Sequence, residues 1–597
     1  MARVAETLVE LPFPHLWSFL PVADRASLVG LSPNDIRAWT SARADEYCRF
    51  ARALLSIYNA VAPIHSLPAE ILSKIFEECW TGRKSLRIGH VCRQWRSVLL
   101  DSKRFWADAV KGGKFTLGDY HTGYLGAMLE RSSPRRIEPS LSRFPADVSR
   151  CLAPHSDRVI SLEVSRVTIA VLLQLWACLN SGMPCLTTLT LTVDEEDFRW
   201  ILHTPTKNLS LSPTALPRLT RVSAPVVLLP SLNRSSLQHL TLTNPITREY
   251  DNGRLQNDSF FKALALCAPN LQTLSLSEAT PWLFNLTAPP FVLPALRHLH
   301  IQDVARRCDL LLDRLALPLT TRIHCTNIDG LGLCLTAPPS APSIQSALSM
   351  TDRVAIVCTV EAVSVHCYAR DSDEALLHVD VGPPAVRPQA VDRLGPSDLI
   401  EFFRDLARAT QLTVAGCIRS DMQAALEWRA FPHLVRAEVR GRGAKYAVKN
   451  LARWQLGDGD STPAHWQAGS SPATTVVCPG LKMLAVDFQF ILGPQRTDGL
   501  GEALRRGDVA GVEADLRKRC ADLEHALSFR SEMGTRLARL EFGCTEQDWS
   551  EGLNERKGTR DPLNPGWTSW RPIVEPLEKL VDGAVVFTGY RYLLADG

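Results

Sequence analysis

Histidine stands next to cysteine at two places in this sequence of 597 residues: His324 precedes Cys325, and His366 precedes Cys367. An imidazole beside a thiol could act as the base that activates a cysteine nucleophile. Consecutive side chains of a strand, however, point to opposite faces of a sheet. We therefore expect a core cysteine beside a surface histidine at both places, and no nucleophile–base pair.

Other polar groups match metal sites and catalytic motifs only weakly. His298 and His300 share one face of an expected strand, but two histidines without a third ligand make a poor zinc signature. Asp371, Asp373 and Glu374 lack the turn glycine and the closing acid of a calcium loop. The sequence has no phosphate-binding glycine loop and no hydrolase nucleophile elbow. We therefore expect no enzyme activity, no metal and no cofactor.

The composition bounds the class of protein. A net charge of +3 without a long basic run argues against a nucleic acid or an anionic membrane as the partner. Glu6 and Glu10 interrupt the N-terminal segment, so we expect no signal peptide, and no window reaches the ~18 apolar residues of a membrane span. The 16 cysteines form no C-x-x-C, which predicts reduced thiols in a cytoplasmic or nuclear protein.

A long helix is expected to follow residues 1–31, which we expect to be only partly ordered. Residues 32–62 predict an amphipathic helix that begins after the N-cap Ser32 and ends before Pro63. Its apolar stripe must pack on something, and we expect it to cover the segment that follows. A dimeric coiled coil is less favoured because the stripe is weak near Arg43. The stripe consists of Ile36, Trp39, Tyr47, Phe50, Leu54, Ile57 and Val61.

Residues 64–107 predict a compact group of short helices. Pro68 stands at a helix start, and large apolar residues follow at helical spacing in two stretches that close at Trp106. A module of about forty residues cannot bury all of these side chains in a core of its own. The surplus predicts either a partner surface or shared packing with the helix at 32–62.

The same segment resembles the F-box motif. It reads L-P-x-E-I-L-x-x-I-F from Leu67 and V-C-R-x-W-R from Val91, although the stretch between Trp80 and Leu86 is shorter and more basic than the motif. The resemblance implies binding to a Skp-type adaptor and, through it, to a cullin-based ubiquitin ligase. It also implies which residues form or brace the contact surface: Leu67, Pro68, Ile71, Leu72, Ile75, Val91, Cys92 and Trp95.

From about residue 150 the apolar pattern changes to a recurring L-x-x-L-x-L. Leu186, Leu189 and Leu191 form one clear copy, and in six copies a proline stands two residues before the first position. The last two apolar positions alternate with polar ones, as in a strand with one buried face. Clear neighbouring copies start 25 or 27 residues apart, within the range of about 20–29 for leucine-rich units. Such units bury their leucines only by stacking on one another.

The whole layout resembles the large group of fungal F-box proteins with degenerate leucine-rich repeats. We expect an α/β chain overall, with a small all-α N-terminal region and an irregular leucine-rich-repeat solenoid that carries a parallel sheet on one face. Residues 108–150 should connect the two, and residues 150–597 should form the solenoid. The repeat register is lost between residues 302 and 408. Surface loops are expected near 336–348, 382–397 and 456–475.

Target contacts, if the solenoid makes them, should lie at polar positions between the buried leucines. The predicted function is therefore that of a target-recognition adaptor of a ubiquitin ligase, with an unknown protein as the target. Two alternatives remain open: a leucine-rich scaffold without a ligase role, and an enzyme with its site in 302–408. The candidate target-binding residues are Thr188, Thr190, His239, Thr241, His298, His300, Arg436, Glu438, Arg539 and Glu541.

Overall fold

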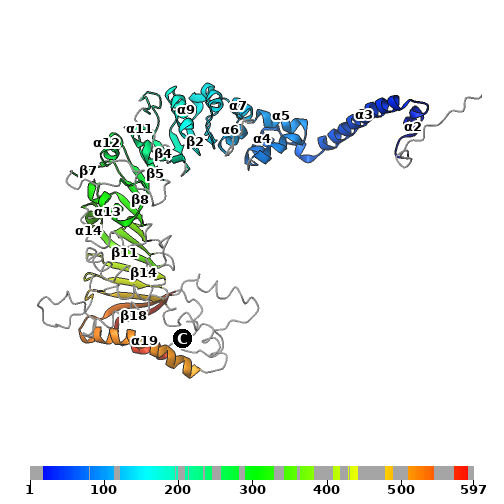
Figure 1. The fold of residues 1–597 in the computed structure, drawn as a ribbon. Helices are drawn as coiled ribbons and strands as arrows, with labels where there is room; N and C mark the ends of the chain where they lie inside the picture. The colour runs from blue at the N-terminus through cyan, green and yellow to red at the C-terminus, as the bar shows by residue number, and fades with distance from the viewer. Residues whose placement is uncertain are drawn as a thin grey trace, which may run out of the picture. The chain divides into compact units, whose positions relative to one another are not determined.

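The computed structural model divides into two compact units. The first comprises residues 1–114 and 118–140, and the second comprises residues 141–597 with 115–117 (Figure 1). The boundary therefore falls inside the segment 108–150 that we expected to connect two parts. The structure describes residues 18–79, 81, 83–112, 122–194, 197–198, 209–212, 214–232, 235–244, 257–281, 289–327, 342–358, 363–381, 408–416, 428, 431–440, 478–487, 509–543 and 571–588.

The described part of the first unit is built of helices, apart from the short strand at its end. No helix among the described residues is long and apolar enough to cross a bilayer. The helices are α2 (Val22–Leu28), α3 (Pro33–Ala60), η1 (Pro63–Ser66), α4 (Ala69–Glu78), η2 (Arg83–His90), α5 (Arg93–Asp101), α6 (Lys103–Gly112) and α7 (Thr122–Arg131).

Helix α3 forms where the sequence predicts it. The Ser32 hydroxyl caps its N-terminus by accepting a hydrogen bond from the Asp35 backbone N–H at 3.3 Å. The expected packing of its apolar stripe on residues 64–107 is absent, because no residue of α3 is buried, and Leu54 is 68% exposed. Its described tertiary contact is instead a polar one with α2, where Arg43 makes an ion pair with the buried Asp24 at 2.9 Å.

The helices after α3 have a core of their own, which explains why they do not need the stripe. Leu72, Phe76 and Leu99 are buried, and the Phe76 and Trp95 rings lie 5.1 Å apart between centroids. The indole N–H of Trp106 donates to the Leu99 carbonyl at 2.8 Å. This core joins α4, α5 and α6 without any contribution from α3.

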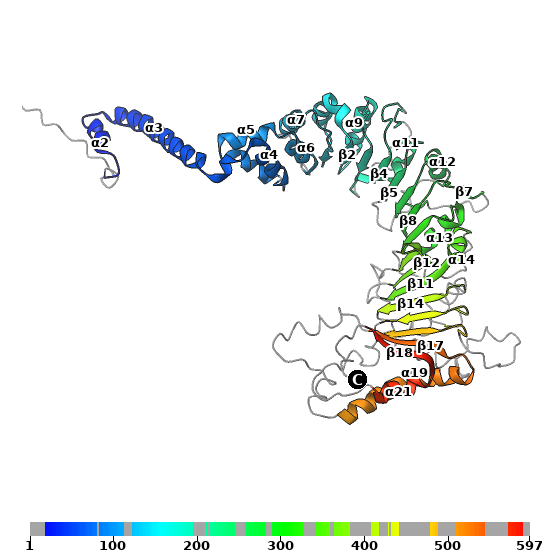
Figure 2. The ribbon, with the colours of Figure 1, turned by 180° about the vertical axis from the view of Figure 1, so that it is seen from behind.

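A 16-stranded sheet organises the second unit (Figure 2). Its strands follow the order β1-β2-β3-β4-β5-β6-β8-β10-β13-β12-β11-β14-β15-β16-β17-β18, while β7 (Phe291–Val292) and β9 (Leu315–Ala316) pair separately. The first half of the large sheet contains β1 (Ser140–Leu141), β2 (Ser161–Val164), β3 (Thr188–Leu191), β4 (Arg221–Pro225), β5 (His239–Thr243), β6 (Thr273–Ser277), β8 (His298–Asp303) and β10 (Arg322–Asn327). The second half contains β11 (Thr351–Cys358), β12 (Val363–Ala369), β13 (Ala375–Val381), β14 (Gln411–Gly416), β15 (Arg436–Val439), β16 (Met483–Asp487), β17 (Leu537–Gly543) and β18 (Val581–Thr588).

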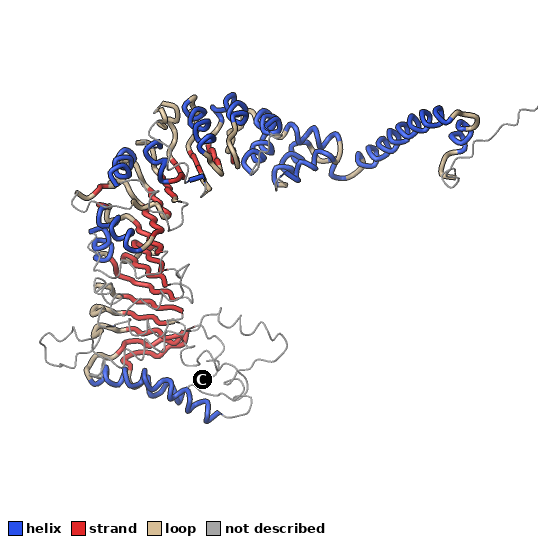
Figure 3. Tube along the Cα trace, in the orientation of Figure 1, coloured by secondary structure: helices blue, strands red, loops and turns tan. Residues whose placement is uncertain are grey.

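Helices alternate with many of these strands. Figure 3 shows the strands as one layer, with α9 and α12 to α14 along one side of it. The helices and helical turns of this unit are α8 (Ala146–Leu152), η3 (Ala153–Arg158), α9 (Ile169–Asn180), η5 (Val226–Leu228), α11 (Leu229–Leu232), α12 (Asn257–Cys267), α13 (Ala305–Arg314), α14 (Pro342–Ser349), α19 (Val509–Glu532) and α21 (Arg571–Glu578).

The apolar pattern of the sequence becomes a buried ladder across the sheet. In β3, Leu189 and Leu191 are buried while Thr188 and Thr190 are partly exposed. Leu189 pairs in register with Leu162 on one side and with Val222 on the other, and both partners are buried. Equivalent positions of successive strands therefore stack on each other and form the core.

The sheet departs from the expected parallel order between β10 and β14. Strand β12 runs antiparallel to both β11 and β13, whereas β13 is parallel to β10 and β11 is parallel to β14. Three strands thus enter the sheet in reverse order. This insertion lies in the segment where the repeat register is lost in the sequence. The sequence could not reveal the reversal, because apolar residues alternate in the same way in both strand directions.

Of the three expected loops, only part of one lies among the described residues. Residues 342–348 belong to helix α14, so the expected loop at 336–348 is wrong there. The prolines of this stretch favoured a loop, but Pro342 occupies the first helical position, where proline is tolerated. The expected loops at 382–397 and 456–475 lie outside the described residues.

Candidate partner-binding surface

Helix α4 divides its apolar residues between two faces. Leu72 and Phe76, four residues apart, are 0% and 1% exposed, whereas Ile71 and Ile75 are 42% and 37% exposed. Residues four apart in a helix lie on the same side, so each pair forms one stripe. Sequence reasoning placed Leu72 with the contact residues; its burial leaves it only the bracing role.

Two further aliphatic side chains of residues 64–107 are also exposed. Val91, which follows η2, is 49% exposed, and Leu100 near the end of α5 is 36% exposed. Pro68 is exposed, while Leu67 and Trp95 are partly exposed. Within residues 64–107, four large aliphatic side chains therefore reach solvent, which favours a surface that another protein covers. We call Ile71, Ile75, Val91 and Leu100 the apolar surface of the first unit.

Cys92 has a structural role at the start of α5. Its side chain caps the helix by accepting a hydrogen bond from the Trp95 backbone N–H at 3.4 Å between nitrogen and sulfur. The same sulfur lies 3.8 Å from Nε2 of His65, and Nδ1 of His65 lies 2.8 Å from the Gln94 side-chain oxygen. These contacts fix η1 against the first turn of α5 and so hold Val91 in place.

Polar contacts orient α4 against α6. The Ser102 hydroxyl donates to the Glu77 carboxylate at 3.2 Å, and Arg104 lies 3.6 Å from the same carboxylate. Ser102 itself is buried. The apolar surface is thus presented by helices whose relative positions are set by both a packed core and hydrogen bonds.

Residues 64–110 match the family model described as F-box-like. The match contains the whole segment that carries the sequence resemblance, so the chain has an F-box-like domain. No curated protein matches the chain.

The candidate target-binding residues of the second unit lie on one face of the sheet. Strand pairing aligns Thr190, Thr241 and His300 in one row, with Glu438 and Glu541 further along the same register. In the next row, Thr188, His239 and His298 are aligned in the first half of the sheet, and Arg436 is aligned with Arg539 in the second half. All ten are at least partly exposed. The sheet therefore gathers them on one surface, opposite the buried leucines.

Sequence reasoning missed a row of histidines on this surface. His300 is in register with His324, His324 with His378, and His378 with His366, across β8, β10, β13 and β12. The His324 and His378 rings are stacked with centroids 4.1 Å apart, and the His366 and His378 centroids are 4.0 Å apart. Each of these histidines follows an apolar residue in a strand, which is a signal in the sequence, but only the strand order brings them together.

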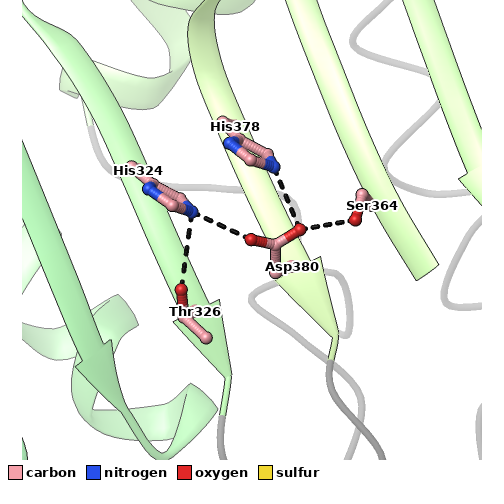
Figure 4. Close-up of polar contacts among 5 residues, drawn as sticks. All are labelled: His324, Thr326, Ser364, His378 and Asp380. Atoms are coloured by element: carbon pink, nitrogen blue, oxygen red, sulfur yellow. Dashed lines mark hydrogen bonds and ion pairs between the residues drawn. The ribbon is translucent and has the colours of Figure 1, made fainter. Parts of the chain in front are cut away.

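Asp380 lies beside this row and joins two of the rings (Figure 4). Nε2 of His324 and Nε2 of His378 each lie 2.9 Å from one of its carboxylate oxygens, and the Ser364 hydroxyl donates to it at 2.5 Å. Burial by itself would raise the pKa of the Asp380 carboxyl, but the hydrogen bonds from the two imidazoles and the hydroxyl outweigh it and hold the pKa well below its usual value.

The expected pairing of core cysteine and surface histidine is confirmed. Cys325 and Cys367 are 3% and 0% exposed, while His324 and His366 lie on the opposite, partly exposed face. Burial raises the pKa of both thiols to about 12. A raised pKa keeps both thiols largely protonated at neutral pH, which makes them weak nucleophiles.

Proposed function

We propose that this chain is the target-recognition subunit of a ubiquitin ligase, in which the F-box-like domain binds a Skp-type adaptor that links it to a cullin. The observation that carries the proposal is the division of α4 into a buried stripe and an exposed one. The match to the F-box-like family supports it independently. The apolar surface of Ile71, Ile75, Val91 and Leu100 would be covered by the adaptor.

The adaptor could bury the parts of Ile71, Ile75, Val91 and Leu100 that are still exposed. Complete burial of an isoleucine or valine side chain contributes about 1.5–3 kcal/mol. Since roughly half of each side chain in the apolar surface is already covered, its further burial contributes about 1 kcal/mol per residue. Four such residues would contribute about 4 kcal/mol to adaptor binding, in addition to any polar contacts at the rim of the interface.

We also propose that residues 150–597 form a degenerate leucine-rich-repeat array and that its polar sheet face binds the target. The buried ladder of apolar residues and the parallel pairing of successive strands support this reading. The chain itself would contribute no catalytic residue. It would hold the target close to a ubiquitin-charged enzyme that the cullin recruits.

Adaptor binding can be tested with the purified full-length chain and a purified Skp-type adaptor. Calorimetry should compare the wild type with Ile71→Asp and Ile75→Asp, because a carboxylate desolvated in an interface costs several kcal/mol. Leu173→Asp on α9 is a matched control, since Leu173 is 55% exposed and lies in the second unit.

We expect both α4 variants to weaken adaptor binding by at least about 100-fold, whereas the α9 control binds like the wild type. Circular dichroism should show that all three variants remain folded. A folded wild-type chain that binds no adaptor would overturn the ligase proposal. The chain would then be a scaffold that uses its F-box-like domain for a different partner.

A further inference from the structure

Three potential metal ligands converge on the sheet of the second unit. Nε2 of His324, Nε2 of His378 and a carboxylate oxygen of Asp380 all lie within 4.8 Å of one another. Their side chains are 38%, 27% and 26% exposed. An ion from solvent can therefore reach these atoms, while the surrounding sheet still shields them in part.

The backbone that carries these residues is regular and central. His324 lies on β10 and pairs in register with His378 on β13, and Asp380 follows two residues later on the same face. Strands β8 and β12 flank the pair on either side. Ligands on central strands are held more exactly in place than ligands on loops, so the backbone needs little ordering when an ion binds.

The interatomic distances are close to those of a filled site. Zinc binds imidazole nitrogen at about 2.0–2.1 Å and carboxylate oxygen at about 2.0–2.2 Å, so two tetrahedral ligand atoms stand about 3.3 Å apart. Each histidine Nε2 is now 2.9 Å from an Asp380 oxygen. The His324 and His378 rings are now stacked, with their planes only 4° apart. Both rings would therefore have to turn until their Nε2 lone pairs point at one ion that also contacts an Asp380 oxygen.

The protonation states are compatible with metal binding. As hydrogen-bond donors to Asp380, both Nε2 atoms carry a proton, which must move to Nδ1 or to solvent when a metal takes its place. The Asp380 carboxylate now accepts a hydrogen bond from each imidazole, one on each oxygen. The Ser364 hydroxyl, at 2.5 Å, would continue to orient this carboxylate from outside the ligand set.

We propose that His324, His378 and Asp380 form a binding site for a divalent transition-metal ion of the zinc class. Two imidazoles and one carboxylate suit such an ion, whereas magnesium and calcium prefer oxygen ligands throughout. Three protein ligands leave a fourth coordination position open to water or to a donor group of a bound molecule. The site does not depend on adaptor binding, so its failure would leave the proposed function untouched.

The test uses untagged full-length protein that has been stripped with a chelator. Exposed Cys48 and Cys79 are first alkylated, because surface thiols also bind zinc. Calorimetry with Zn²⁺ and with Mg²⁺ then compares the wild type with His378→Gln and Asp380→Asn. Both replacements can keep a hydrogen bond between strand neighbours, so the fold should survive.

His298→Gln is the matched control, since His298 is an exposed histidine on the same sheet face but outside the ligand set. Cobalt(II) serves as a spectroscopic probe in all four proteins. Ligation by nitrogen and oxygen gives visible ligand-field bands without the near-ultraviolet band of cobalt–thiolate bonds.

We expect one Zn²⁺ per wild-type chain, no heat from Mg²⁺, and a loss of at least about 100-fold in Zn²⁺ affinity in His378→Gln and in Asp380→Asn. The His298→Gln control should bind as the wild type does. Absence of Zn²⁺ binding by the wild type would overturn the proposal and leave the three residues as a hydrogen-bonded network. So would a cobalt spectrum that is unchanged in His378→Gln.

Discussion

Truncation of two neighbouring residues of α4 should lower the stability of the domain by very different amounts. Leu72 is 0% exposed, so Leu72→Ala removes buried methyl groups and leaves a cavity, which costs about 2–5 kcal/mol. Ile71 is 42% exposed, so Ile71→Ala loses only part of a transfer free energy and leaves no cavity, for a cost below about 1 kcal/mol. The first change should loosen the domain, and the second should weaken only the binding of a partner.

Hydrogen exchange followed by mass spectrometry on the full-length chain can separate these outcomes. Peptides from α4 and α5 report the free energy of local opening, and a loss of 2 kcal/mol corresponds to exchange that is about 30-fold faster. We expect at least that acceleration in Leu72→Ala and less than about 5-fold in Ile71→Ala. Equal acceleration in the two variants would refute the division of α4 into a core face and a binding face.

Three further outcomes can be measured on the full-length chain. Iodoacetamide should modify exposed Cys48 long before Cys325, whose thiol pKa burial raises to about 12, and peptide mass spectrometry would record the order. Arg530 is fully buried and donates to two backbone carbonyls at 3.2 Å, so Arg530→Met should lower the free energy of unfolding by about 2–4 kcal/mol, seen as faster exchange in β16. Burial and then the nearby Arg221 lower the pKa of His239, so its protonation opposes folding as the pH falls below about 6.5. The melting temperature of the wild type should therefore drop relative to His239→Gln between about pH 7.5 and 5.5, and parallel pH profiles would contradict this.

Much of the second unit follows from local patterns. Leu189 and Leu191 alternate with threonines, which indicates a strand with one buried face, and the structure confirms that burial in β3. The helical spacing in residues 32–62 likewise predicts α3 correctly. Its partner could not be predicted in the same way, because an apolar stripe shows that a face is available and not which surface meets it.

The order of the strands could not be predicted from the sequence, and the reason is physical. The alternation of buried and exposed residues is identical in parallel and antiparallel strands, so β12 carries no sign of its reversed direction. The metal-ligand candidates were missed for the same reason. His324 and His378 are 54 residues apart in the chain, and only the pairing of β10 with β13 makes them neighbours.

The reversed three-strand insertion has a consequence for how the chain folds during its synthesis. From β2 to β10, each strand finds its next neighbour 18 to 34 residues later. For β10 this separation is larger, since Ile323 pairs with Leu377, 54 residues further on. At a translation rate of about 5–20 residues per second, the open edge of β10 persists for roughly 3–10 s.

An open strand edge is a template for pairing with other chains. A nascent chain of this protein is thus most prone to misassembly while β11 to β13 are still being made, and a pause in translation there would prolong the exposure. Chaperone binding by stalled ribosomal chains should accordingly peak for those in which β10 has left the ribosome and β13 has not.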